Sequence, residues 1–135
     1  MKKETVIVII AGTLIVLATI WIVGKIKELN ATYIAVDDEE KLEALSKELS
    51  EARAFAFDTE TTGKNPLETG LVGLSFAIKP DEAYYIPVGH KSGKQLDIND
   101  VLKALKPVLE DNNIKKYGQN IKYDNEVMFN YGINV

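Results

Sequence analysis

The chain begins with a continuous hydrophobic run. Residues 5–23 (TVIVIIAGTLIVLATIWIV) contain no charged side chain. As a helix, this run would span roughly 28 Å at ~1.5 Å per residue, close to the ~30 Å hydrocarbon core of a bilayer. It is apolar on all sides, and Trp21 lies near one end, where an interfacial indole is favoured. The pattern predicts a membrane anchor over residues 1–24 and a linker over residues 25–32.

Two alternatives for this run are weaker. It is long for a cleaved signal peptide, and no clear small-x-small cleavage site follows it. A buried strand or helix without any charge would be hard to cover in so small a domain. We therefore expect a single-pass, membrane-anchored protein. Lysines flank the run on both sides, so the sequence leaves its orientation open.

The remainder, residues 33–135, alternates between short apolar runs and amphipathic segments. Leucines at positions 42, 45 and 49 follow helical spacing, whereas other apolar runs are short and bounded by turn residues. The strands predicted in this way are 33–36, 54–58, 71–78, 83–88 and 114–117, and the helices are 39–52, a segment carrying Val101 to Leu109, and 120–131. A hairpin followed by strand–helix units indicates an α/β fold with a mixed sheet.

Local signals refine these elements. Asp37 or Asp38 is expected to cap the first helix, and Asn99 or Asp100 the second. Gly132 is expected to end the last helix.

Small and bulky residues alternate along residues 71–78 (LVGLSFAI). Side chains alternate between the two faces of a strand, so the small residues Gly73, Ser75 and Ala77 share one face. The pattern predicts that the bulky side chains enter the core, while another part of the chain packs closely against the small ones.

The composition excludes several kinds of site and catalysis. The chain has no cysteine and one histidine, which excludes disulfides, a thiolate zinc site and cysteine catalysis. Its net charge is −4, and residues 29–135 alone carry −6, since the first 28 residues hold four lysines and two glutamates. An acidic domain is a poor candidate for strong non-specific binding to duplex DNA.

Two carboxylates, Asp58 and Glu60, end an apolar strand with one residue between them. Their side chains point to the same side of the strand, and like charges at close range repel unless they share a cation. Such oxygen ligands suit Mg²⁺ or Mn²⁺. Taken alone, the pair is much more typical of solvated acids at a strand end than of a metal site.

The surrounding residues carry a family resemblance. FDTETTG, which contains Asp58 and Glu60, and GQNIKYD, which contains Asp124, resemble the first and second motifs of the 3′–5′ exonuclease (proofreading) domain of bacterial family A DNA polymerases. The intervening text, including NPLETGLVGLSFAI and AYYIPVGH, is also similar. The resemblance covers residues 33–135 and implies an RNase H-like exonuclease fold of the four-carboxylate superfamily.

The resemblance also implies residue roles. Asp58, Glu60 and Asp124 would bind two Mg²⁺ or Mn²⁺ ions and act as the catalytic carboxylates. Thr59, Thr61, Gln119, Asn120 and Tyr123 would line the site or contact the strand. The implied activity is two-metal hydrolysis of DNA from a single-stranded 3′ end, of the proofreading or repair type. A cytoplasmic position of the domain is expected if it acts on DNA.

The sequence departs from the family in three places. The third motif, which supplies a fourth carboxylate, is absent, and so is the last strand of the family's sheet, so we expect a fold that is incomplete at its C-terminus. Lys64 stands where relatives have a leucine. The membrane anchor is not typical of the family. These departures leave open that a polymerase domain or another protein partner supplies missing elements, that the chain is a fragment, or that it is an inactive membrane-tethered module that binds single-stranded nucleic acid or a protein.

Three aromatic residues between the two motifs are predicted to be structural. His90 is expected to make hydrogen bonds within its loop. Tyr84 and Tyr85 are expected to pack in the core or along the edge of the sheet rather than to stack on bases.

Overall fold

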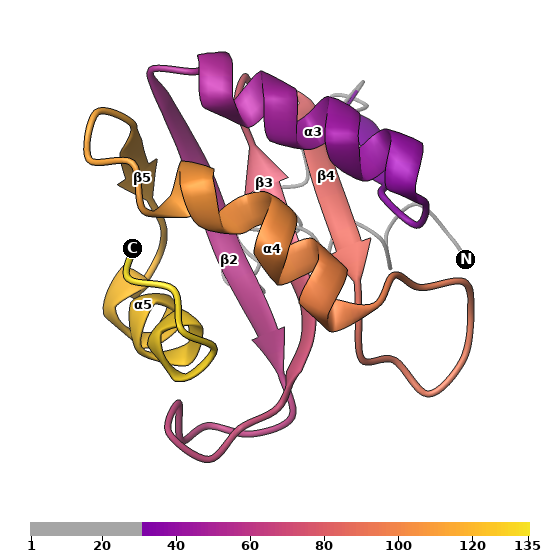
Figure 1. The fold of residues 1–135 in the computed structure, drawn as a ribbon, viewed down its shortest axis with the longest axis vertical. Helices are drawn as coiled ribbons and strands as arrows, with labels where there is room; N and C mark the ends of the chain where they lie inside the picture. The colour runs from indigo at the N-terminus through magenta and orange to yellow at the C-terminus, as the bar shows by residue number, and fades with distance from the viewer. Residues whose placement is uncertain (1–30) are drawn as a thin grey trace, which may run out of the picture.

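The computed structural model describes residues 31–135, which form a five-stranded mixed sheet in the order β1-β4-β3-β2-β5 (Figure 1). The strands are β1 (Thr32–Ala35), β2 (Ala54–Thr61), β3 (Leu71–Ala77), β4 (Glu82–Pro87) and β5 (Lys115–Tyr117). Strand β3 is antiparallel to both β2 and β4, whereas β1 with β4 and β5 with β2 are parallel pairs. The α/β class and all five predicted strands are therefore confirmed.

Helices α3 (Glu39–Glu51) and α4 (Ile98–Leu109) lie across one face of the sheet (Figure 1). Every second side chain of β2 and β3 points toward these helices, and Phe57 stacks on Phe76 with ring centroids 6.3 Å apart. The fully buried side chains of this layer include Val36, Leu45, Leu49, Phe55, Phe57, Leu74, Phe76, Ile86, Leu105 and Leu109. The core predicted from the bulky residues of β3 therefore lies between the sheet and these two helices.

Helix α5 (Ile121–Asn130) lies at the edge of the sheet rather than on its face (Figure 1). Strand β5 pairs only with residues 54–56 of β2, so among the strands of residues 31–135 none lies beside the later residues of β2 on that side. Helix α5 occupies this place. Gly132 follows the helix at φ 78°, in the left-handed region that glycine adopts without strain, as predicted.

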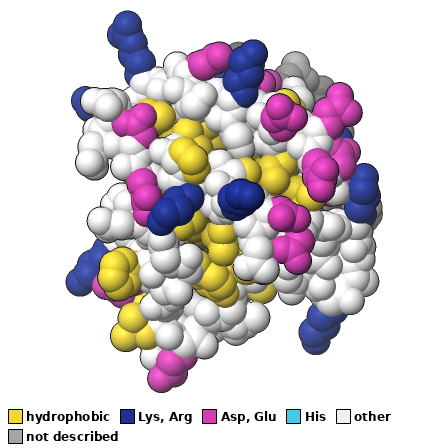
Figure 2. Space-filling view, viewed as in Figure 1, with side chains coloured by type: hydrophobic (Ala, Val, Ile, Leu, Met, Phe, Trp, Pro, Cys, Tyr) yellow, Lys and Arg dark blue, Asp and Glu magenta, His cyan; other side chains and the backbone are white. Residues whose placement is uncertain are grey.

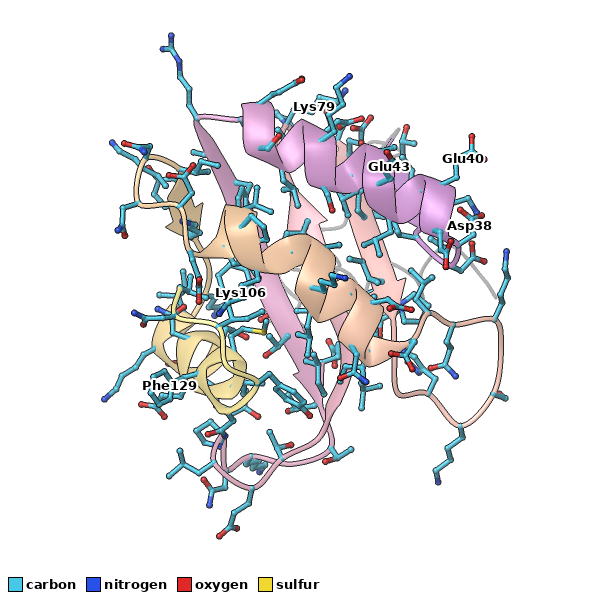
Figure 3. The ribbon with its side chains drawn as sticks, in the orientation of Figure 1. Asp38, Glu40, Glu43, Lys79, Lys106 and Phe129 are labelled. Atoms are coloured by element: carbon cyan, nitrogen blue, oxygen red, sulfur yellow. The ribbon has the colours of Figure 1, made fainter. Side chains whose placement is uncertain are left out.

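Lys106 connects α4 to this last helix. Its ammonium group contacts Glu110 Oε1 at 2.6 Å and also donates to the carbonyl of Gly132, and Figure 3 shows it reaching from α4. Asn134 N donates to the same Glu110 oxygen at 3.0 Å. The turn after α5 is therefore fixed to the helical layer, which helps to hold α5 at the sheet edge.

One predicted cap is wrong. Helix α4 is capped by Asp97, whose side chain accepts from Asn99 N at 2.8 Å, and not by Asn99 or Asp100. Asp97 has the extended backbone that a cap requires, and Ile98, the first helical residue, packs against the core. The regular apolar spacing begins only at Val101, so the hydrophobic pattern does not mark the first turn of the helix.

The predicted cap of α3 is confirmed and gives a testable expectation. Asp38 accepts from Lys41 N at 2.9 Å. Replacing Asp38 by alanine leaves that N–H without its side-chain partner, so the free energy of unfolding measured in urea titrations should fall. Asp38→Asn keeps a capping oxygen and should lose less; equal losses would contradict the capping role.

The helical face of the domain carries charges of both signs (Figure 2). Acidic side chains gather where α3 begins, and hydrophobic side chains show between the helices (Figure 2). Among residues 31–135, no helix has the length and hydrophobicity needed to cross a bilayer. The anchor predicted over residues 5–23 lies outside the described residues.

Candidate active site

Strand β2 presents its two acidic side chains on the face opposite the core. Phe55, Phe57 and Thr59 are buried toward the helices, so Asp58 and Glu60, which alternate with them, project from the other face. In the ladder with β3, Asp58 lies opposite Ser75 and Glu60 lies opposite Gly73. The prediction that the two carboxylates share one side of the strand is confirmed.

Asp124 reaches this strand from α5. Its side chain is 2% exposed and accepts two hydrogen bonds from Thr59, from the backbone N at 2.9 Å and from Oγ1 at 2.6 Å. The contact lies where β2 has no neighbouring strand on that side. A residue 65 positions away in sequence is therefore fixed beside Asp58 by the threonine between the two strand carboxylates.

The three carboxyl groups influence one another strongly. Burial, and then the charges of Asp124 and Glu60, raise the pKa of Asp58 from 3.8 to about 7. Burial, then the charge of Asp124, also raises the pKa of Glu60. Burial raises the pKa of Asp124, although its hydrogen bonds from Thr59 act in the opposite direction. Concentrated negative charge in a partly buried place is what a bound cation relieves.

The other predicted site residues divide into two groups. Tyr123 Oη hydrogen-bonds Thr61 Oγ1 at 2.6 Å and donates to the Gly63 carbonyl at 2.7 Å, so it joins α5 to the end of β2. Gln119 and Asn120 are exposed in the turn before α5, and Asn120 adopts φ 55°. The structure therefore brings Thr59, Thr61 and Tyr123 to the carboxylates and leaves the other two at the rim of α5.

The carboxylates of this site fit a divalent cation in their chemistry, although their side chains are not arranged as a complete set of metal ligands. Among the described residues, no group of three or more acidic, histidine or cysteine side chains is placed to hold a metal ion. One oxygen of Asp124 is instead engaged by Thr59. Carboxylate oxygens held near one another with raised pKa values are the ligands that Mg²⁺ and Mn²⁺ prefer.

A second group near Glu60 was not recognised as part of the site from sequence. Tyr85 Oη lies 2.6 Å from His90 Nε2, and Gln95 holds His90 by two hydrogen bonds to its backbone. Burial, then the charge of Glu60, raises the pKa of Tyr85 to about 12. The predicted loop hydrogen bond of His90 is confirmed, and Tyr84 packs in the core as predicted. The row of small residues on β3 was the available signal for the placement of Tyr85.

A concavity of about 390 Å³ lies on the outer side of α5. Leu67 and Phe129 line it and are 69% and 66% exposed, and Figure 3 shows Phe129 standing on the outer side of the helix. Glu126 also faces this concavity, and its Oε1 lies 3.9 Å from Lys122 Nζ. Glu126 therefore lies on the outer side of α5, whereas Asp124 faces β2. Lys64 is exposed in the loop of residues 62–70.

A mixed sheet with Asp58 and Glu60 on one face of β2 and Asp124 held beside the same strand defines an α/β domain with a group of three carboxylates. The chain belongs to the 3′–5′ exonuclease family, whose model matches residues 33–135. DNA polymerase I of Pseudomonas aeruginosa is 46% identical over 101 residues, covering 73% of this chain and 11% of that protein. DNA polymerase I of Chloroflexus aurantiacus is 44% identical over 100 residues, covering 74% and 11%. The chain thus spans about a tenth of the length of these relatives.

Solved structures agree on the fold. The Trypanosoma brucei RNase D complex with RNA U12 superposes with a TM-score of 0.65 at 22% identity, covering 78% of this chain and 36% of that one. Escherichia coli RNase D gives a TM-score of 0.57 at 21% identity, covering 73% and 24%. These neighbours show the RNase D-type, RNase H-like exonuclease fold.

The bond between Thr59 and Asp124 can be tested through stability. Thr59→Val keeps the shape of the side chain but removes the donor of the 2.6 Å bond. Hydrogen bonds to charged groups contribute about 1.5–3 kcal/mol, so the free energy of unfolding at pH 8 should fall by about that amount. Thr59→Ser keeps the hydroxyl and should lose less in the same urea titration; a larger loss in Thr59→Ser would contradict this assignment.

Proposed function

We propose that this chain is a metal-dependent 3′–5′ exonuclease-type domain that hydrolyses DNA from its 3′ end, of the proofreading or repair type. The observation that carries the proposal is the partly buried group of Asp58, Glu60 and Asp124, in which burial and mutual repulsion raise the pKa of Asp58 to about 7. A fold maintains such an unfavourable arrangement where function requires it. Membership of the exonuclease family supports the same conclusion.

Asp58, Glu60 and Asp124 are the residues that would hold Mg²⁺ or Mn²⁺. A pair of such ions supplies an activated water and stabilises the leaving 3′ oxygen. The chain contributes orientation. Thr59 holds Asp124 against β2, and Tyr123 holds Thr61 and the loop that follows it.

The proposed substrate is a short single-stranded 3′ end. Residues 29–135 carry a net charge of −6, so the domain has little attraction for long stretches of duplex, and bound cations would supply the positive charge at the scissile phosphate. Thr59, Thr61 and Tyr123 lie beside the carboxylates, and Gln119 and Asn120 are exposed at the start of α5. We propose that these five residues contact the strand.

The proposal is tested with the full chain in a non-ionic detergent and a 5′-labelled single-stranded DNA, with Mg²⁺ or Mn²⁺ added. A ladder that shortens from the 3′ end, and that EDTA abolishes, is the expected result. A matching RNA oligonucleotide establishes the preference between the two nucleic acids. Folded protein that produces no ladder with either metal, even at high enzyme concentration, would reject the activity.

A second function is a binding module without catalysis of its own. Two observations favour it: the described carboxylates form no finished three-ligand metal site, and apolar Leu67 and Phe129 stand exposed beside α5. In this case a polymerase domain or another protein partner would supply a further carboxylate. We propose that residues 5–23 would anchor either form as a single-pass protein, with the domain on the cytoplasmic side. Binding of labelled single strands without hydrolysis distinguishes this function from the first.

A further inference from the structure

Tyr85 lies unusually close to β3 at the position opposite Glu60. A Cβ added to Gly73 would lie 2.1 Å from the Tyr85 hydroxyl oxygen, so only glycine leaves room for the phenol there. Gly73 is the direct cross-strand partner of Glu60 in the ladder between β2 and β3. The Tyr85 hydroxyl therefore occupies the place where the side chain opposite Glu60 would stand.

This placement puts the hydroxyl on the same face of the sheet as the Glu60 side chain, over the residue that pairs with Glu60. Directly opposite residues of an antiparallel pair have Cβ atoms about 4.5–5.5 Å apart on the same face. Glu60 extends from that face, and its charge contributes to the raised pKa of Tyr85. The hydroxyl thus lies on the β3 side of Glu60, whereas Asp124 and α5 lie on the other side of β2.

The Tyr85 hydroxyl is also held by His90. His90 Nε2 lies 2.6 Å from it, and the two rings meet edge to face at a centroid distance of 5.7 Å. His90 N donates to Gln95 Oε1 at 2.6 Å, and Gln95 Nε2 donates to the His90 carbonyl at 2.8 Å. The loop of residues 88–97 therefore presents His90 to Tyr85 in one orientation, which is more than packing of an edge tyrosine requires.

We propose that Tyr85, oriented by His90, is a positioning residue for Glu60, to whose carboxylate it donates a hydrogen bond that fixes the orientation in which Glu60 binds a divalent cation. The proposal requires the tautomer in which His90 donates from Nε2 to the Tyr85 oxygen, because the Tyr85 O–H is then free to donate to Glu60. The inference rests on the cation site of the proposed function. Partners that orient metal ligands in this way typically contribute about 10–100-fold to metal affinity or activity.

Tyr85→Phe tests the proposal, because it removes only the hydroxyl. In titration calorimetry of the full chain in detergent, the Mn²⁺ dissociation constant should rise about tenfold. In the DNA assay, kcat should fall by a similar factor while KM for the strand stays unchanged. Tyr84→Phe is the matched control: Tyr84 lies next to it on β4, and its hydroxyl bonds Glu48 at 2.9 Å and Glu82 at 2.7 Å, away from the carboxylates. The control should bind Mn²⁺ like the wild type.

His90 supplies the second arm of the test. His90→Leu should also weaken Mn²⁺ binding, and the double variant with Tyr85→Phe should be no weaker than Tyr85→Phe alone, because His90 acts only through the hydroxyl. Unchanged Mn²⁺ affinity in Tyr85→Phe, or equal losses in Tyr84→Phe and Tyr85→Phe, would overturn the positioning role while leaving the cation site intact. A wild-type chain that binds no Mn²⁺ would reject the cation site itself, and this inference with it.

Discussion

Replacement of Asp58 by alanine is expected to reduce Mg²⁺-dependent release of nucleotides from a DNA 3′ end by at least about 10³-fold. The reduction should exceed the ~10–100-fold effect of removing a residue that only orients a metal ligand. Asp58 is the carboxylate whose pKa responds to both Asp124 and Glu60, so it is the one best placed to share cations with each. Gel analysis of 5′-labelled strands measures the loss.

The matched control is Asp100→Ala, which removes an exposed carboxylate from the first turn of α4. This variant should retain wild-type activity. Its net charge is the same as that of Asp58→Ala. Thermal unfolding of both variants shows that they are folded. Full nuclease activity in Asp58→Ala would show that the cutting site lies elsewhere in the preparation or the protein.

Without divalent ions, the chain is expected to become less stable as the pH rises from about 4 to about 7. Asp58 has a pKa of about 7 in the folded state and 3.8 ordinarily, so within this window the folded state binds more protons than the unfolded state. Stability then falls with increasing pH and levels off above 7. Glu60 and Asp124, whose pKa values are also raised, act in the same direction.

The measurement is the unfolding temperature in EDTA at pH 5 and pH 8. We expect the value at pH 8 to be lower by at least about 5 °C, the shift that ~1 kcal/mol produces in a domain of this size. Mn²⁺ should reverse the difference, since it binds the charged carboxylates of the folded state. Asp58→Asn should flatten the dependence and be more stable than wild type at pH 8. A wild-type chain that is equally stable at both pH values in EDTA would contradict the raised pKa of Asp58.

Other titrations act outside this window. The hydrogen bond and charge of Lys41 lower the pKa of Asp37, and a hydrogen bond from Tyr84 lowers that of Glu82. These groups stabilise the fold above their ordinary pKa values, and this contribution is lost at lower, acidic pH. The slope between pH 5 and pH 8 therefore reports on the carboxylates of the candidate site.

The elements of the fold were largely predictable because each depends on neighbours in sequence. Leu42, Leu45 and Leu49 follow helical spacing, and all three are buried along α3. The limits of β2 were not predictable in the same way. The strand continues through Glu60 to Thr61 because its antiparallel pairing with β3 continues, although those residues are polar. Pairing with β3 therefore determines where β2 ends, which local hydrophobicity does not indicate.

The residues of the candidate site also differ in whether local sequence or a distant contact determines their placement. That Asp58 and Glu60 share a face follows from strand periodicity alone. The approach of Asp124 was implied only by the family resemblance, because the bond to Thr59 joins residues 65 positions apart. The placement of Tyr85 over Gly73 was half predicted: the small residues of β3 indicated a close neighbour, but nothing local identified which side chain it would be.

Asp124 has a consequence for solubility as well as for chemistry. Beyond residue 56, β2 is an edge strand, and its exposed N–H groups would be a template for pairing with a strand of another molecule. The Asp124 carboxylate engages the N–H of Thr59, and α5 lies beside β2 at that edge (Figure 1). Loss of Asp124 would therefore promote self-association together with any catalytic defect. Asp58, which projects from the face of the sheet, is the cleaner position at which to separate chemistry from aggregation.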